Sequence, residues 1–412
     1  MAQRHLDPTD PPAAATATAP PAAPTAATAP GRSAPDRSAP ADAEALAGYL
    51  RAQATEFLRA LRLHRETGTG THGGHGGHGG HGTPGAQATE TPPAGPVDAS
   101  RLLRRAARRL SGTLHTFQPL LDADWAEAMR PELAWLSGTL ALEHACASRL
   151  ERLLEALHRL SGSSSFPARQ QGRTTAVTVT VPAPHQSPPH QSPPDRGNLT
   201  VGAAKAGALL DRQLTLARTR AHSTALQALG SSRFHAVADK VALLASEVPL
   251  RKTTTPATDL RPLAAAAESR LTDAVTALPL VTAGNPYNAQ ALIHGLSPDP
   301  APHPQDAQWH QVRLLLRLHR YALEVLSAGT AGDAEDPAPS HDIRLLAAGE
   351  ALNRHRDASE AAAAAAQAAR TPRIAPATAY ALGVLHADQR HEVEAARYAF
   401  QHSWRKEPIR LP

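Results

Sequence analysis

The apolar residues of this chain are mostly Ala and Leu, and they recur at the three- and four-residue spacing of an amphipathic helix. Aromatic residues make up only 3% of the 412 residues, whereas a β-sandwich would be rich in Val, Ile, Tyr and Phe. We therefore expect an all-α fold of about eight to ten helices. The helical stretches are 41–65, 98–161 (two or three helices), 203–229, 233–246, 260–278, 308–326, 343–370 and 378–406.

Three segments have compositions that do not suit a packed core. Residues 1–41 are rich in Pro, Ala and Thr, residues 66–96 contain GTHGGHGGHGGHG, and residues 162–200 contain HQSPPHQSPP. These segments have few large apolar residues, and the surface they can bury does not offset the entropy lost on ordering. We therefore expect a disordered tail and two flexible inserts. The inserts interrupt a helical domain at 42–408, whose front half is 42–161 and whose back half is 201–408. The alternating segment AVTVTVP at 176–182 lies inside an insert, and we do not expect it to form a strand.

Several kinds of protein are disfavoured by what the sequence lacks. The single cysteine, Cys146, excludes an internal disulfide and a zinc site built from cysteines, and we expect it to be a core residue. No run of eighteen apolar residues predicts a transmembrane helix, and the start MAQRHLDPTD does not resemble a secretion signal. We therefore expect a cytoplasmic protein with no membrane partner.

Metal and catalytic motifs also give no positive signal. His72, His75, His78 and His81 recur every third residue, but a glycine-rich segment does not fix the geometry that a metal site needs. The sequence contains no glycine-rich phosphate loop ending in Lys-Ser/Thr, no GxSxG and no HExxH. Phosphoryl transfer would also require carboxylates that hold Mg²⁺ near the phosphate. We expect a binding protein with no catalytic residue, metal or cofactor.

Two stretches carry basic residues along one side of a helix. At about 100° per residue, each set falls within an arc of roughly 80°. The front set is Arg101, Arg104, Arg108 and His115, and the back set is His310, Arg313, Arg317 and Arg320. Neither 101–114 nor 308–322 contains Asp or Glu. Like charges at this spacing repel one another, and an anion lying along the stripe would offset that repulsion.

The overall charge agrees with a polyanionic partner but does not identify it. The net charge is +5, and only four of the 42 basic residues are lysines. Arginine suits multidentate contact with phosphate oxygens, although a GC-rich genome would produce the same bias. A solvated charged face, neutralised by acidic residues from elsewhere in the fold, is the alternative reading of the stripes.

The two basic stretches resemble the signature helices of the CHAD domain, the conserved histidine α-helical domain, whose pattern is roughly His-x-x-Arg-φ-x-x-(Arg/Lys)-Arg-Leu-Arg, with φ an apolar residue. HQVRLLLRLHRYALEVL matches it at His310, Arg313, Arg317, Arg320 and Tyr321. RLLRRAARRLSGTLHTFQPLL matches it at Arg104, Arg108, Arg109 and Leu110, with Arg101 in place of histidine and Ser111 in place of a basic residue. The resemblance extends over about 42–406, apart from the inserts.

A second signature supports the resemblance in the back half. LNRHRDA at 352–358 resembles the acidic turn of the family, with His355 and Asp357 at the matching places. The equivalent front segment, ALEHACA, has His144 and Ala145 where Arg-Asp is typical. The back half is therefore expected to dominate binding.

The resemblance implies two pseudo-repeated four-helix bundles around a basic surface or channel that binds inorganic polyphosphate. The first choices for residues that contact phosphate are Arg104, Arg108, His310, Arg313, Arg317, Arg320 and His355. Second choices are Arg101, Arg109, His115 and Tyr321. Histidines in such a lining are expected to gain protons from the field of the anion, so binding is expected to strengthen below neutral pH.

Two further expectations concern partners. A protein of this kind would associate with polyphosphate-containing granules. Nucleic acid is the alternative partner for the same basic helices, as in a nucleoid-associated protein. The scarcity of aromatic residues argues against single-strand binding by stacking, and no helix-turn-helix or zinc motif supports reading of a duplex.

Overall fold

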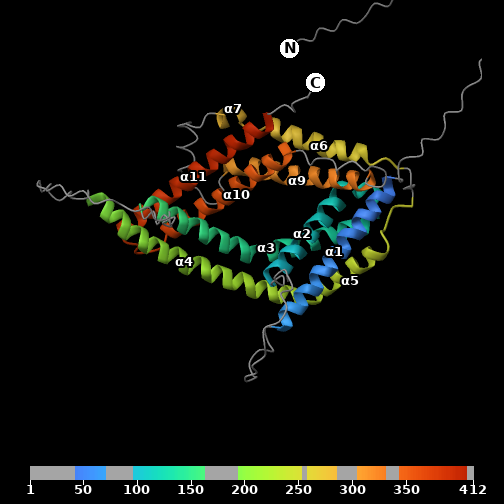
Figure 1. The fold of residues 1–412 in the computed structure, drawn as a ribbon, viewed down its shortest axis with the longest axis horizontal. Coiled ribbons are helices and arrows are strands. Elements are labelled where there is room, and N and C mark those ends of the chain that lie inside the picture. Colours follow the sequence, from blue (N-terminus) through green and yellow to red (C-terminus); the bar gives the residue numbers. More distant parts are fainter. Residues whose placement is uncertain are drawn as a thin grey trace, which may run out of the picture. The chain divides into compact units, whose positions relative to one another are not determined.

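The computed structural model describes residues 42–70, 96–162, 194–252, 258–284, 304–330 and 343–405. These ranges contain ten α-helices, one short 3-10 helix and, in place of a sheet, an isolated bridge between Leu121 and Leu250 (Figure 1). The prediction of an all-α fold is therefore confirmed. The tail at 1–41, most of the two inserts, the run from His72 to His81 and the segment 176–182 lie outside the described residues.

The helices follow the predicted stretches closely. They are α1 (Asp42–Gly70), α2 (Pro96–Thr116), η1 (Gln118–Leu120), α3 (Ala123–Leu160), α4 (Pro194–Leu229), α5 (Ser232–Ser246), α6 (Arg261–Thr276), α7 (Leu280–Ala283), α9 (Pro304–Thr330), α10 (Ile343–Ala369) and α11 (Pro376–Arg405). Helices α1 and α4 extend a few residues into the segments expected to be flexible, because adding a residue to an existing helix is much easier than starting one. The short α7 lies between the predicted helical stretches 260–278 and 308–326.

Side-chain caps fix where two of these helices begin. Asp122 precedes α3 and its carboxylate accepts a hydrogen bond from the backbone N–H of Trp125. Ser231 precedes α5, and its hydroxyl accepts from the backbone N–H of Phe234. Both satisfy an amide that the first turn of a helix leaves without a partner. These caps set the register of the faces that α3 and α5 present to the core.

The buried apolar residues form three clusters, and the division into front and back halves does not separate them. The first contains Phe57 of α1, Phe117 after α2, Phe234 of α5 and Val325 of α9. The second joins α3 and α4 to α10 and α11, whereas the third joins α6, α9, α10 and α11. Helices from the two halves therefore share cores, with α1 and α2 packed against α9. The internal duplication remains a prediction.

The contact between α2 and α9 is close because α2 has a glycine there. A Cβ atom on Gly112 would lie 2.6 Å from Cδ2 of Tyr321, so any larger residue would displace that ring. Leu318, one turn away on α9, is 3.2 Å from the same point. This approach positions the basic faces of α2 and α9 beside each other.

Candidate anion-binding site

The two basic stripes meet across the contact between α2 and α9. A cavity of about 500 Å³ opens there, with side chains of both helices in its wall. Its lining residues are Arg101, Arg104, Arg105, Arg108, Arg109, His144, Arg317, Arg320, Tyr321 and Glu324. Stripes that lie about two hundred residues apart in the sequence therefore contribute to one surface.

A second cavity of about 320 Å³ adjoins the first. Arg108, Arg317 and Tyr321 line both, so the two spaces lie against the same side chains. The second cavity adds His115 of α2 and Arg130 of α3 to the lining. We call these two spaces together the arginine cavity.

The arginines of this cavity repel one another. Burial lowers the pKa of Arg317 to about 10, and the charges of Arg108, Arg356 and Arg104 also act to lower it. Burial likewise lowers the pKa of Arg313 to about 9, together with Arg317, Arg356 and Arg108. Guanidinium groups with such pKa values still carry their full charge at neutral pH. The protein therefore holds a concentrated positive charge at this point.

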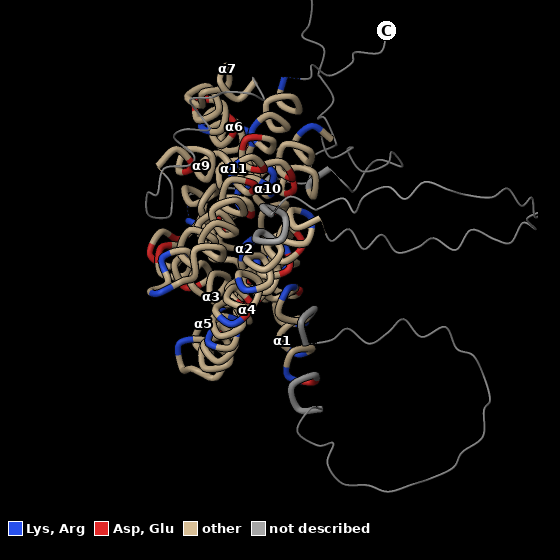
Figure 2. Tube along the Cα trace, turned by 90° about the vertical axis from the view of Figure 1, so that its left-hand side faces the viewer, with Lys and Arg blue, Asp and Glu red and all other residues tan. Residues whose placement is uncertain are grey.

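Acidic side chains do not neutralise the centre of the cluster. Within the described ranges, no hydrogen bond or ion pair to a carboxylate is found for Arg104, Arg108 or Arg317, and all three are half-buried. Arg313 lies beside the cavity lining, where its Nε donates to Asn353 Oδ1 at 2.8 Å. Along the trace, Lys and Arg positions are interspersed with Asp and Glu positions (Figure 2). The cluster therefore stands out by how its side chains are arranged, and not by the overall balance of charged residues.

Arg109 differs from its neighbours because it has an acidic partner. Its Nε and Nη2 donate to Glu324 of α9 at 2.9 and 3.2 Å, and the hydroxyl of Tyr49 donates to the same carboxylate at 2.8 Å. Burial and the adjacent Glu324 charge raise the pKa of Tyr49, so it stays protonated and continues to donate. Contact of Arg109 with phosphate stays a prediction, and this pairing weighs against it.

His355 and Asp306 belong to a buried network behind the cavity. Asp306 is fully buried and accepts hydrogen bonds from Arg390 at 2.8 Å and Arg397 at 2.7 Å. His355, 1% exposed, has its Nε2 3.5 Å from Asp306 Oδ1 and its ring stacked on Trp309. Burial alone would raise the pKa of Asp306, but hydrogen bonds from His355 and Arg390 lower it below its ordinary value.

The position of His355 bears on two expectations, and both stay predictions. The side chain lines neither part of the arginine cavity, so the structure gives no support to a direct contact between His355 and phosphate; it supports α10 against α9 and α11 instead. Burial also lowers the pKa of His355 to about 4, and it lowers the pKa of His310, His115 and His144. In the absence of an anion, burial therefore acts against protonation of these imidazoles, and stronger binding below neutral pH stays a prediction.

The remaining predicted residues occupy different places. Arg101 is exposed at the cavity rim, with Nη2 3.4 Å from His144 Nδ1. Arg320 and Tyr321 are half-buried and line the cavity. His310 packs edge-on against His355 and lies outside the cavity lining.

Sequence reasoning missed one basic residue that acts on this cluster. The charge of Arg356 in α10 contributes to lowering the pKa of Arg104, Arg108, Arg313 and Arg317. Arg356 donates to Asp357 at 2.6 Å, so it is partly neutralised. It lies inside the LNRHRDA segment, between His355 and Asp357, and that position was the available signal.

The described residues thus define an all-helical protein with an arginine-lined cavity between two packed helices. The sequence profile of the CHAD domain matches residues 89–366, and the chain belongs to the CHAD family. No helix in the described ranges has the length and apolar character required to cross a bilayer.

The solved structures similar to the chain include the following two. PptA from Streptomyces chartreusis is 62% identical, with a TM-score of 0.65, over 89% of this chain and 100% of that one. The CHAD domain from the plant Ricinus communis is 16% identical, with a TM-score of 0.42, over 87% of this chain and 92% of that one. None of the curated proteins matches the sequence.

Proposed function

We propose that this protein binds inorganic polyphosphate in the arginine cavity and does not turn it over. The observation that carries the proposal is the convergence of Arg104 and Arg108 of α2 with Arg317 of α9 on one cavity, without acidic partners in the described ranges. Membership of the CHAD family supports the same ligand, because the family resemblance implies polyphosphate binding.

The chemistry of the cavity suits a flexible linear polyanion. Polyphosphate has about one negative charge per phosphate and no bases, so binding depends on charge and on oxygen acceptors alone. Guanidinium groups present several N–H donors in a plane and bridge neighbouring phosphate oxygens. A bound chain would also relieve the repulsion among the arginines. The two parts of the cavity share Arg108, Arg317 and Tyr321, and their volumes of about 500 and 320 Å³ offer space for several phosphates.

The proposal extends to location and partners. We propose a cytoplasmic protein that associates with polyphosphate-containing granules through this site. Duplex DNA is the competing partner, because it carries a similar density of phosphate charge.

Competition between long-chain polyphosphate and duplex DNA for the purified full chain tests this function. Polyphosphate should displace DNA at equal phosphate concentration, and the phosphate released on long incubation should not exceed the protein-free background. Arg108→Ala should weaken polyphosphate binding, whereas Arg59→Ala, which removes an exposed arginine paired with Glu56 on α1, should not. Preferential binding of DNA would replace the proposal with the nucleic-acid alternative.

A further inference from the structure

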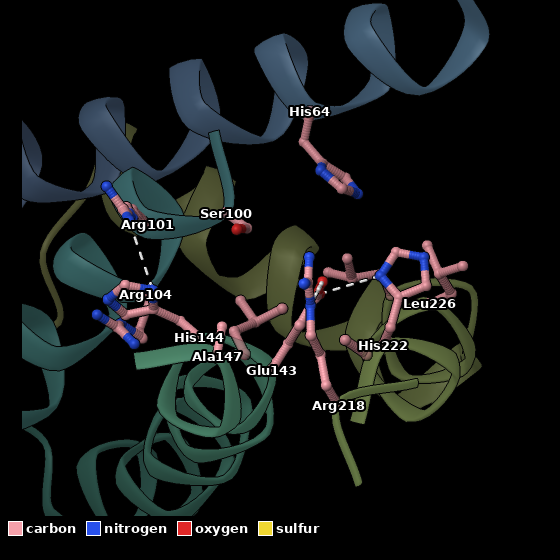
Figure 3. Close-up of a pocket in the computed structure, with 13 residues that line it drawn as sticks. His64, Ser100, Arg101, Arg104, Glu143, His144, Ala147, Arg218, His222 and Leu226 are labelled. Atoms are coloured by element: carbon pink, nitrogen blue, oxygen red, sulfur yellow. Dashed lines mark hydrogen bonds and ion pairs between the residues drawn. The ribbon is translucent and has the colours of Figure 1, made fainter. Parts of the chain in front are cut away.

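A separate pocket of about 150 Å³ lies beside the arginine cavity, between α1, α2, α3 and α4 (Figure 3). Its wall is largely apolar, with Leu140 of α3 and Leu226 and Leu229 of α4. An inorganic phosphate chain has no group that would gain from an apolar wall. The pocket is therefore unexplained by polyphosphate binding.

The pocket and the arginine cavity share three side chains. Arg101, Arg104 and His144 line both, so a ligand that occupied both spaces would pass these residues. A pocket this small is below the roughly 300–1,000 Å³ that hold whole drug-sized ligands. It has room for one ring system, and the rest of such a ligand would lie in the arginine cavity.

The polar groups of the pocket suit a planar heterocycle. Glu143 places a carboxylate in the wall, 3.0 Å from His222 Nδ1 and 3.8 Å from Arg218 Nε. A carboxylate there accepts hydrogen bonds from the N–H groups of a base edge. His64 extends toward the pocket from α1, while Arg218 and His222 extend from α4 (Figure 3). Imidazole and guanidinium groups stack on the faces of nucleobases.

We propose that this pocket holds the base of a nucleoside oligophosphate whose phosphates lie in the arginine cavity. The proposal rests on the proposed function, since it places phosphates at Arg101 and Arg104. It goes further by assigning a second ligand class and a subsite that distinguishes that class from inorganic polyphosphate. The ribose would pass the shared residues, where the apolar pocket ends and the arginine lining begins.

Calorimetric titration of the full chain with three triphosphates tests the base pocket. The probes are inorganic tripolyphosphate, methyl triphosphate and ATP, with GTP as a second base, at one ionic strength and without divalent metal. Like ATP, methyl triphosphate carries an ester on its α-phosphate, but it lacks a base. ATP or GTP should bind roughly five- to tenfold more tightly than methyl triphosphate, as expected for stacking of one base.

Matched variants connect this gain to the pocket. Leu226 and Leu216 are 51% and 50% exposed on the same helix, but Leu216 does not line the pocket. Leu226→Ala should reduce the preference for ATP over methyl triphosphate, and Leu216→Ala should leave it unchanged. Ala147→Leu, which fills the pocket from α3, should abolish the preference without changing the affinity for tripolyphosphate.

Each outcome separates the two proposals. Equal affinity for ATP, GTP and methyl triphosphate would overturn the base pocket and leave polyphosphate binding intact. A preference that persists in Ala147→Leu would place the base elsewhere and would also overturn it. If long-chain polyphosphate and all the triphosphates failed to bind, the proposed function itself would be wrong, and the base pocket with it.

Discussion

Arg109 of α2 and Glu324 of α9 form an ion pair, with Nε 2.9 Å from Oε2. The pair lies in the wall of the cavity where Arg104, Arg108 and Arg317 have no carboxylate partner among the described residues. Tyr49 of α1 donates to the same carboxylate, so the pair ties three helices together. Glu324 therefore stabilises the fold while placing a negative charge where a polyanion is proposed to bind.

Glu324→Gln should change stability and binding in opposite directions. Unfolding in urea should show a loss of about 1–3 kcal/mol, since Arg109 and Tyr49 lose a charged acceptor. Affinity for polyphosphate should rise by roughly three- to tenfold at low salt, because a like charge leaves the cavity and Arg109 is released. Glu268→Gln, an exposed change on α6, should alter neither quantity. Unchanged or weaker binding by Glu324→Gln would contradict the position assigned to the ligand.

The combined substitution of Arg313 and Arg317 by Ala should reduce the salt dependence of polyphosphate binding. For each phosphate contact that is lost, binding releases about one fewer counterion from the polyphosphate. The slope of log affinity against log salt should therefore flatten by about one to two units. Fluorescence titrations at several salt concentrations measure this slope. The same double change at Arg212 and Arg220, which are exposed on α4, controls for loss of net charge and should leave the slope near that of the wild type.

Gly112→Ala should disrupt the contact that brings the stripes together. The new methyl group would lie 2.6 Å from the ring of Tyr321, so the ring or the helices must move. Overpacking of this kind costs about 1–3 kcal/mol, and polyphosphate affinity should fall as the arginines separate. Gly138→Ala on α3, where a Cβ meets nothing within 4 Å, should be neutral or stabilising by about 0.5–1 kcal/mol. Equal thermal unfolding of the two variants would argue against a tight contact.

The stability of the protein should depend on pH through His355. Burial lowers its pKa to about 4 in the folded protein, whereas an unfolded chain protonates histidine near 6.5. The unfolded state therefore binds more protons between these values, so the free energy of unfolding should rise with pH from about 4 to 6.5 and level off above. The rise should be on the order of 3 kcal/mol.

His355→Gln tests the source of that pH dependence. It removes the titrating group, so the dependence between pH 4 and 6.5 should flatten, measured by urea unfolding. His235→Gln, an exposed change on α5, should retain the wild-type profile. An unaltered profile for His355→Gln would mean that other groups dominate.

The sequence predicted local features well, because helical spacing and charge spacing are properties of neighbouring residues. The bounds of α10 and α11 agree with the predicted stretches to within two residues, and the stripe from Arg101 to Arg108 follows from periodicity alone. The meeting of α2 with α9 depends instead on tertiary packing, and the role of Gly112 in it has no local signature.

Two features of the fold have no local signal in the sequence. Asp306 and Glu324 each pair with residues from other helices. His355 matched a family signature for binding, but the fold buries it against Asp306. Burial and long-range pairing are set by the whole fold, so residue type and spacing did not reveal them.

The crowded arginines also bear on how this chain tolerates change. Replacing Arg104, Arg108 or Arg317 with a neutral residue of similar size would relieve repulsion in the folded state. Such a variant should have a higher free energy of unfolding than the natural protein. These charges therefore lower the stability of the folded protein while they form the binding site. A screen for stabilised variants will select substitutions at these three positions, so the positions should be kept fixed in any such screen.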